Sequence, residues 1–329
     1  MINVAIAGLG RWGRNLVEAA RGHQRLKIVR AVEPDLKGAQ DFCAKHQLAL
    51  TDSLDEVLAD DSIGAILLAT PHSLHRAQVM ACAAARKQVF CEKPLALRRA
   101  DAAAMFSACR DASVVLAVGH NRRFWPAMRA LREIIASGEL GTILHVEGHN
   151  SNENSQAITA GWRLSSEESP GGGLTGAGLH VLDAFVSMLG PVSRVYAQLT
   201  SREAGPPPLD TALMTVDFVN GATGTLATVR ATPFYWRVHV FGTKGSAEVL
   251  DDRTMILRMT GPEPQRINYP GIDVLRAELD AFTDTIEMQR PFPVPEPDVL
   301  ATLSAFEAAL QSMTSGLPVN CHGGDDLGA

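Results

Sequence analysis

The sequence predicts a two-domain α/β protein, with a doubly wound parallel sheet in the first domain and a mostly antiparallel sheet in the second. Short apolar runs alternate with helical patterns over residues 1–121, as βαβ units require. A glycine-rich turn, Gly8-Leu9-Gly10-Arg11-Trp12-Gly13, joins the first apolar run to the first helical pattern. Beyond residue 140, strand-like segments follow one another through short turns such as Asn220-Gly221, which is typical of antiparallel sheets.

The strands of the first domain are predicted from apolar runs that suit strands buried on both faces. They are expected at Asn3–Ala7, Lys27–Val32, Gly64–Thr70, Gln88–Cys91 and Val114–Gly119. Between them, alanine-rich patterns predict helices such as Leu74–Arg86 and Arg98–Arg110.

The second domain, residues 122–329, contains more strands than helices. Its strands are expected at Leu140–Asn150, Ser193–Thr200, Thr211–Val219, Gly224–Arg230, Arg237–Phe241 and Ala247–Leu250. Its helices are expected at Trp125–Ser137, Leu174–Leu189, Val274–Arg290 and Asp298–Ser315, and the C-terminal helix is expected to pack back on the first domain. We also expect a surface loop at Gly205–Pro208 and a partly disordered tail at Cys321–Ala329.

Composition excludes several classes of protein. A net charge of −6 gives no basic field for nucleic acid, and no apolar stretch approaches the length of a membrane span. The five cysteines are irregularly spaced without a Cys-x-x-Cys pair, so they suggest reduced thiols rather than a zinc site or disulfides. Without a signal-peptide pattern, the protein is expected to be cytoplasmic.

The glycine turn has the residues that a dinucleotide requires. Gly8 allows a tight turn, Gly10 lets the backbone approach a pyrophosphate, and Gly13 lets the helix pack close to the strand. The N–H groups at the helix start, including those of Arg11 and Trp12, favour a phosphate. Glu33 follows the second apolar run and would bind the ribose hydroxyls of NAD. Pro34-Asp35 adds a second carboxylate and no arginine for a 2′-phosphate, so NAD is favoured over NADP.

Two further strand ends carry polar residues, and ligands bind beyond the carboxyl ends of strands in open α/β sheets. One end continues as Thr70-Pro71-His72-Ser73-Leu74-His75 and the other as Glu92-Lys93-Pro94. The Lys93 ammonium is expected to polarise a hydroxyl or carbonyl. Residues expected to contact the cofactor here are Thr70, Pro71, His72, His75, Glu92 and Lys93. Ser73 is a candidate helix N-cap, and the His72–His75 spacing alone predicts no metal site.

A second glycine-rich segment leads to a histidine. Gly171-Gly172-Gly173 precedes Leu174-Thr175-Gly176, and Gly176 lies four residues before His180. Glycine inside a helix costs about 1 kcal/mol relative to alanine, so this helix start is best explained by a close approach to another group. His180 is the natural general base or acid near neutral pH.

These segments together resemble the glucose–fructose oxidoreductase / inositol dehydrogenase (Gfo/Idh/MocA) family. The motifs are the first glycine turn, Ala69-Thr70-Pro71 with His75, Cys91-Glu92-Lys93-Pro94, Asn121-Arg122-Arg123-Phe124, Trp162-Arg163, the glycines leading to His180, and Phe241-Gly242-Thr243-Lys244-Gly245. The resemblance implies an N-terminal Rossmann domain and a C-terminal α/β domain whose open sheet forms a homodimer or homotetramer. It also implies hydride transfer between nicotinamide and a carbinol carbon of a sugar, polyol or cyclic diol, with Lys93 and His180 as catalytic residues.

The family's catalytic aspartate lies four residues before the histidine, where this chain has Gly176. Three explanations compete. Gly176 makes room for a different substrate, another acid such as Glu147 or Glu153 replaces the aspartate, or catalysis is lost. We favour the first explanation because Lys93 and His180 are both present.

Polar residues near the expected pocket suggest the substrate. His149, Asn150 and Asn152 follow a strand. Arg122 and Arg123 lie where the chain leaves the first domain, and an arginine there could hold a carboxylate, as in carboxylated diols. Residues expected to contact the small-molecule substrate are Arg122, Asn150, Trp162, Arg163, Thr175 and Gly176. Two alternatives to a dehydrogenase stay open, namely a dinucleotide- and metabolite-binding sensor and an assembly subunit that uses the open sheet.

Overall fold

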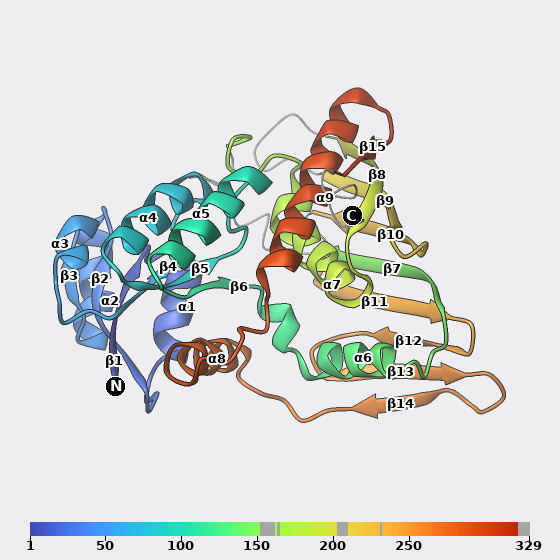
Figure 1. Cartoon of the computed structure of the whole chain (residues 1–329), viewed down its shortest axis with the longest axis horizontal. Coiled ribbons are helices and arrows are strands. Elements are labelled where there is room, and N and C mark those ends of the chain that lie inside the picture. The colour runs from blue at the N-terminus through green and yellow to red at the C-terminus, as the bar shows by residue number, and fades with distance from the viewer. Residues whose placement is uncertain (152–161, 163–164, 203–209, 231, 322–329) are drawn as a thin grey trace. The chain divides into compact units, whose positions relative to one another are not determined.

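The computed structural model describes residues 1–151, 162, 165–202, 210–230 and 232–321 (Figure 1). The chain divides into two compact units. The first contains Met1–Asn121 and Asp273–Glu296, and the second contains Arg122–Ile272 and Pro297–Ala329. The expected loop at 205–208 and the tail after Cys321 lie outside the described residues.

The first unit is built on a six-stranded parallel sheet in the order β3-β2-β1-β4-β5-β6. Its strands are β1 (Ile2–Ala7), β2 (Leu26–Val32), β3 (Ala49–Thr51), β4 (Ala65–Leu68), β5 (Gln88–Glu92) and β6 (Leu116–Gly119). Every residue of β4 is fully buried, as expected for a strand covered on both faces. The strand order reverses between β1 and β4, which creates the kind of crevice where such sheets bind ligands.

Helices connect these strands and cover the sheet (Figure 1). They are α1 (Arg11–Ala19), α2 (Leu36–His46), α3 (Leu54–Leu58), α4 (His72–Ala84), α5 (Arg99–Asp111) and, from later in the chain, α8 (Val274–Met288). The predicted parallel, doubly wound fold of this part of the chain is confirmed.

Helix α8 belongs to the first unit because charged and aromatic contacts hold it there. The Arg25 guanidinium forms an ion pair with Asp284 and donates a hydrogen bond to the Asp280 carbonyl at 3.1 Å. Arg276 donates to the Ala19 carbonyl, at the end of α1, at 3.2 Å. The Phe282 ring meets the edge of Phe90 at 5.9 Å between centroids.

The second unit is built on a nine-stranded sheet in the order β14-β13-β12-β11-β7-β10-β9-β8-β15. Its strands are β7 (Ile143–Ser151), β8 (Val192–Ser201), β9 (Asp210–Phe218), β10 (Thr223–Val229), β11 (Tyr235–Gly242), β12 (Gly245–Val249), β13 (Thr254–Met259), β14 (Gln265–Asn268) and β15 (Val319–Asn320). Neighbouring strands pair antiparallel, except that β7 and β10 are parallel to each other. The predicted mostly antiparallel sheet is therefore confirmed.

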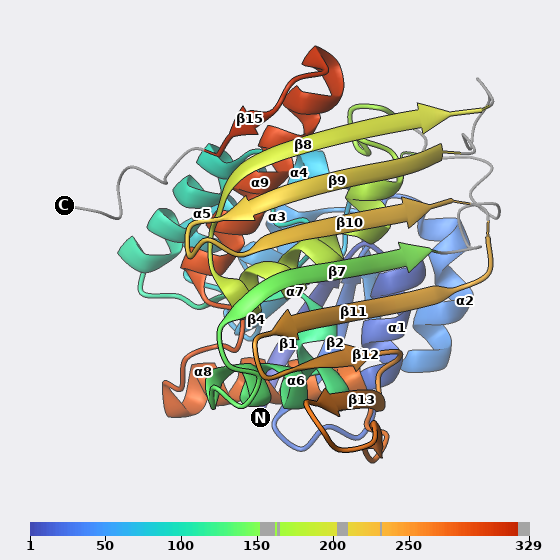
Figure 2. The ribbon, with the colours of Figure 1, turned by 90° about the vertical axis from the view of Figure 1, so that its right-hand side faces the viewer.

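The two faces of this sheet differ. On one face Gly148 of β7 packs against Val181 and Phe185, so that a Cβ atom at Gly148 would lie 2.2 Å from the Val181 side chain. The described helical elements that lie wholly or mostly in this unit include a 3₁₀ turn (Asn121–Phe124), α6 (Pro126–Ala136), a π-helical turn (Leu174–Gly178), α7 (Leu179–Leu189) and α9 (Glu296–Ser315). The opposite, outer face is turned toward the viewer in Figure 2, where no described helix lies in front of the strands.

The described helices include none that is long and apolar enough to cross a membrane. All five cysteines are free thiols and all are buried.

Candidate active site

The glycine turn after β1 is shaped by two close backbone contacts. Gly8 has φ +89°, and a Cβ atom there would lie 2.7 Å from the Ala69 carbonyl oxygen, just after β4. A Cβ atom at Gly13 would lie 1.9 Å from the Gly8 carbonyl oxygen. At Gly10 a Cβ atom would have no described atom within 4 Å. Gly8 and Gly13 therefore serve the packing of the turn, whereas Gly10 lies on open surface directly before α1.

The Glu33 carboxylate lies against this turn. Its Oε2 accepts a hydrogen bond from the Leu9 N–H at 2.7 Å, and its Oε1 accepts one from the Asp35 N–H at 3.3 Å. The Asp35 side chain in turn caps α2 by accepting from the Gly38 N–H at 3.0 Å. The two predicted carboxylates thus lie at the end of β2, beside the turn that follows β1.

His75 joins the segments that follow β4 and β5. Its Nδ1 lies 2.9 Å from the Pro94 carbonyl oxygen and its Nε2 lies 3.1 Å from the Thr70 carbonyl oxygen, and a neutral imidazole donates to one of the two. The side chain is completely buried. His75 therefore holds the Thr70 and Pro94 backbone in place from beneath the surface.

Lys93 follows β5 directly, at the carboxyl edge of the sheet. The Glu92 carboxylate accepts a hydrogen bond from the Lys93 N–H at 3.3 Å, and the Lys93–Pro94 peptide is cis. Glu92 pairs with Gly119 of β6, so the buried His120, which was not predicted, follows β6 at the same edge. Lys93 and His120 therefore follow strands at the same edge of the sheet as the glycine turn.

The start of α4 differs from the prediction. The helix begins at His72 with Pro71 as its N-cap residue, so Ser73 lies inside the first turn and the N-cap prediction was wrong. Proline fixes the backbone at φ −55° one residue before the helix and sets its start. The ring centroids of His72 and His75 are 5.9 Å apart. Within the described ranges, no three His, Cys, Asp or Glu side chains are grouped as a metal site would need.

His180 is carried by the first turn of α7, which follows the π-helical turn Leu174–Gly178. His180 is 6% exposed. The Asn150 side chain donates a hydrogen bond from Nδ2 to the Ala177 carbonyl at 2.9 Å, and the buried Thr175 hydroxyl donates to the Pro170 carbonyl. Asn150 and Thr175, both predicted to contact substrate, therefore hold the backbone of the segment before His180. Short π-helical turns inside helices often mark functional sites.

Gly176, four residues before His180, is exposed. A Cβ atom there would have no described atom within 4 Å. Packing therefore gives no reason for glycine at this position.

Arg122 lies among aromatic rings of the second unit. Its Cζ is 4.0 Å from the centroid of Trp125, 5.4 Å from that of Trp236 and 5.9 Å from that of Phe234. Such stacking uses the faces of the guanidinium, and its N–H groups point outward in the plane. Trp162 is partly buried. Arg163, Asn152 and Glu153 lie outside the described residues.

Glu147 and His149 face away from His180. They alternate along β7 with Gly148 and Asn150, whose side of the sheet carries α7, so they lie on the outer face. Glu147 forms an ion pair with Arg237 at 2.6 Å there. Burial, reinforced by Arg237, lowers the pKa of His149. The suggestion that Glu147 replaces the missing aspartate was therefore wrong.

A buried ion-pair network anchors α7 and was not predicted. Arg123 binds Asp183 with two nitrogens, at 3.0 Å from Nε to Oδ2 and 2.8 Å from Nη2 to Oδ1. Its Nη1 donates to Asp298 of α9 at 2.6 Å. Asp183 lies one helical turn after His180, so this network fixes the helix that carries the imidazole.

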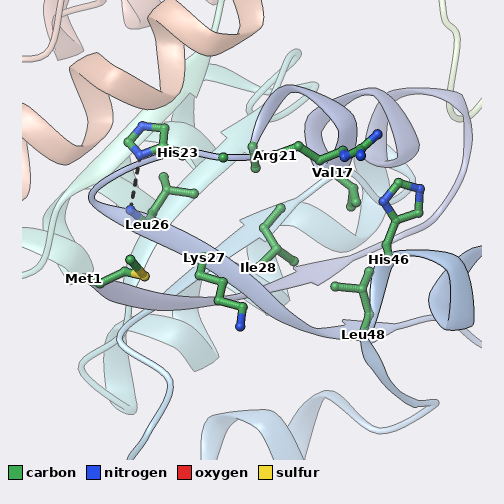
Figure 3. A pocket seen from close by; sticks show the side chains of 11 residues that line it. Met1, Val17, Arg21, His23, Leu26, Lys27, Ile28, His46 and Leu48 are labelled. Carbon is green, nitrogen blue, oxygen red and sulfur yellow. Dashed lines mark hydrogen bonds between the residues drawn. The ribbon is translucent and has the colours of Figure 1, made fainter.

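A pocket in the first unit lies away from the predicted residues. It has a volume of about 300 Å³ and is lined by the end of α1, the start of β2 and residues near the end of α2, including Val17, Leu26, Lys27 and His46 (Figure 3). It shares no residue with the glycine turn or with Lys93. Because β2 begins there, it lies at the amino ends of the parallel strands, opposite the edge where such sheets bind ligands.

The glycine turn at the reversal point of a 3-2-1-4-5-6 parallel sheet defines the first unit as a dinucleotide-binding fold. Residues 2–120 match the model of the oxidoreductase family with an NAD-binding Rossmann fold, and residues 128–248 match the GFO/IDH/MocA C-terminal domain. The chain belongs to the Gfo/Idh/MocA family and is an NAD(P)-binding oxidoreductase.

Three relatives illustrate the range of the family. Myo-inositol 2-dehydrogenase of Thermotoga maritima is 30% identical over 272 residues, covering 78% of this chain and 80% of the relative. 2,7-anhydro-N-acetylneuraminate hydratase of Escherichia coli (strain K12) is 29% identical over 257 residues, covering 76% and 68%. The crystal structure of GenD2 from gentamicin A biosynthesis, in complex with NAD, has a TM-score of 0.86 at 25% identity, covering 98% of this chain and 97% of GenD2.

We expect substitutions of Gly13 and of Gly10 to have different effects. Gly13→Ala places a Cβ atom against the Gly8 backbone, so we expect a loss of stability of about 3 kcal/mol or more, as in severe overpacking. Gly10→Ala has room, so we expect a near-normal melting temperature and at least a tenfold weaker affinity for NADH. Thermal unfolding without cofactor and NADH fluorescence titration measure the two effects. Normal NADH affinity in Gly10→Ala would contradict the proposed approach of the pyrophosphate.

Proposed function

We propose that this chain catalyses NAD-dependent hydride transfer between nicotinamide and a carbinol carbon of a sugar, polyol or cyclic diol. The observation that carries the proposal is the position of Lys93, directly after β5 at the same edge of the sheet as the glycine turn. Family membership supports the cofactor, and the names of the inositol, diol and xylose dehydrogenases among the relatives support the class of substrate.

The residues of the first unit fit a dinucleotide. Gly10 leaves open surface before α1, where N–H groups of Arg11 and Trp12 begin a helix of nine residues. Thr70, Pro71 and His72 follow β4 on the other side of the strand reversal, and Glu92 fixes the Lys93 backbone. Bound NAD would accept the hydride from the carbinol carbon.

Lys93 and His180 would handle the proton in this reaction. Oxidation of an alcohol releases a hydride from carbon and a proton from the hydroxyl oxygen, and ketone reduction reverses both. An imidazole accepts that proton near neutral pH, while an ammonium donates a hydrogen bond to the same oxygen and stabilises its negative charge. We assign the first role to His180 and the second to Lys93.

The proposed preference for NAD rests on Glu33. Its carboxylate lies 2.7 Å from the Leu9 nitrogen at the end of β2, where an acid binds ribose hydroxyls in related folds. A 2′-phosphate at the same place would meet this charge and that of Asp35.

The proposed substrate is larger than a simple sugar or is anionic. Gly176 removes one carboxylate from the segment before His180 and leaves open surface there. Arg122, oriented by Trp125, suits a bidentate contact with a substrate carboxylate. A carboxylated cyclic diol has the anionic group. A dinucleotide-binding sensor is the alternative, and it predicts binding without turnover.

We also propose that the outer face of the nine-stranded sheet binds a second copy of the chain. The face mixes both charges in small networks, such as Arg237 with Glu147 and Glu248 at 2.6 and 2.8 Å. Leu213 and Tyr235 are each about half exposed on it. A face with balanced charges and exposed apolar residues suits a two-fold interface in which it meets itself.

A substrate screen with catalytic variants tests the proposed reaction. Sugars, polyols and carboxylated cyclic diols are incubated with NAD or NADH, and products are followed by absorbance and by mass spectrometry, which also detects a net addition of water. Lys93→Met and His180→Gln should each lower kcat by about 10²-fold or more, as general acid–base residues do, with NADH affinity nearly unchanged. Lys27→Met and His145→Gln are matched controls. Full activity in either catalytic variant would refute its role, and binding without turnover would favour the sensor.

Glu33→Gln tests the cofactor preference. The amide keeps an oxygen that can accept from the Leu9 N–H but loses the charge, so the ratio of the NADP to the NAD dissociation constant should fall by about tenfold or more, the scale of a charged hydrogen bond. Glu56→Gln, which changes a carboxylate bound to Thr51, is the control. Equal ratios in Glu33→Gln and the unmodified chain would remove Glu33 from the cofactor site.

Sedimentation velocity tests the proposed pairing. The unmodified chain should sediment as a dimer or tetramer, and Leu213→Lys should shift it toward monomer because it adds a charge within the outer face. Met80→Lys, at an exposed position of α4, is the control and should leave the distribution of oligomers unchanged. A monomeric unmodified chain at micromolar concentration would refute the pairing.

A further inference from the structure

The second unit contains a buried carboxylate that neither the motifs nor the proposed chemistry use. Asp210 is the first residue of β9 and is 2% exposed. Its Oδ2 lies 3.3 Å from Arg230 Nε, close enough for an ion pair but outside hydrogen-bond geometry. Burial raises the pKa of Asp210, against the opposing effects of Arg230 and of a hydrogen bond from Gly173. A carboxylate kept in such a place needs a structural or functional reason.

The carboxylate is directed at the glycine segment before His180. Oδ1 accepts a hydrogen bond from the Gly173 N–H at 3.0 Å. A Cβ atom at Gly172 would lie 2.5 Å from Oδ2, and one at Gly173 would lie 2.9 Å from Oδ1. Both residues must therefore be glycine for Asp210 to approach, which gives two of the three consecutive glycines a physical explanation.

Gly173 is also where the helical segment that carries His180 begins. The π-helical turn starts at Leu174 and runs into α7, and neither has an acidic residue in its first turn. A negative charge at the start of a helix is stabilising because N–H groups there lack partners within the helix. Asp210 supplies this charge from a neighbouring strand.

The rest of the segment is fastened at its other end. Asn150 holds the Ala177 carbonyl at 2.9 Å, and a Cβ atom at Gly178 would lie 2.9 Å from the Thr228 side chain of β10. Five residues, Leu174–Gly178, lie between Gly173 and Leu179, the first residue of α7. A shift of the Gly173 end is therefore passed along a short, packed segment to His180.

We propose that Asp210 is a positioning residue, which fixes the start of the segment Gly173–Gly178 and through it the place of His180. The inference rests on the proposed role of His180 in the reaction. Asp210 itself contacts neither substrate nor cofactor in this account. Its substitution is therefore expected to lower kcat while the binding of NADH stays the same.

Asp210→Asn and Asp210→Ala, with Asp217→Asn as the matched control, test the proposal. Asp217 lies on the same strand but pairs with Arg194 at 2.7 Å and is partly exposed. The ring signals of ¹³C-labelled histidine, with His180 assigned through His180→Gln, report the place of the imidazole without any substrate. The control should leave the His180 signal unchanged.

We expect the His180 signal to shift or broaden in Asp210→Ala and less so in Asp210→Asn, which keeps an oxygen that can accept from Gly173. With a substrate from the screen, kcat should fall tenfold or more in Asp210→Ala, with NADH affinity changed less than twofold. An unmoved His180 signal in a folded variant would overturn the inference, as would a moved signal with unchanged kcat. If the unmodified chain turns over no substrate, the proposed function fails, whereas the His180 signal still decides whether Asp210 positions that side chain. If Asp210→Ala does not fold, the isosteric Asp210→Asn decides the result.

Discussion

The approach of the Gly13 backbone to the Gly8 carbonyl is the constraint on which the first unit depends. Because Gly13 has no side chain, its backbone can pack against the Gly8 carbonyl, and α1 can begin directly over the carboxyl end of β1. The same turn packs Gly8 against the Ala69 carbonyl after β4, and it gives Glu33 an N–H partner at Leu9. One contact between two glycines thus brings the ends of three strands together around the start of a helix.

Glycines in the second unit serve a comparable purpose with a different partner. At Gly172 and Gly173 the missing side chains admit the carboxylate of Asp210, and at Gly178 the missing side chain admits Thr228 and Leu174. Gly176 differs because no described group occupies the position of its missing side chain. Of these four glycines, Gly176 therefore changes the surface rather than the packing.

The sequence predicted features that depend on local pattern and missed those that depend on distant partners. Apolar runs identified the strands around the glycine turn and Lys93 to within a few residues. Strand β14, Gln265–Asn268, was missed because it has little apolar character and lies at the edge of the sheet. Its apolar neighbour β13 was missed as well. Glu147 was considered for the wrong face, because the side that a residue takes on β7 depends on the packing of Gly148 against α7. The role of Asp210 and the ion pairs of Arg123 were missed because their partners lie tens of residues away.

A crystal structure of the chain with NAD bound tests the central claim most directly. The account predicts the pyrophosphate at the N–H groups of Gly10, Arg11 and Trp12, and the adenosine ribose at the Glu33 carboxylate. A dinucleotide bound elsewhere, or with its ribose away from Glu33, would contradict it.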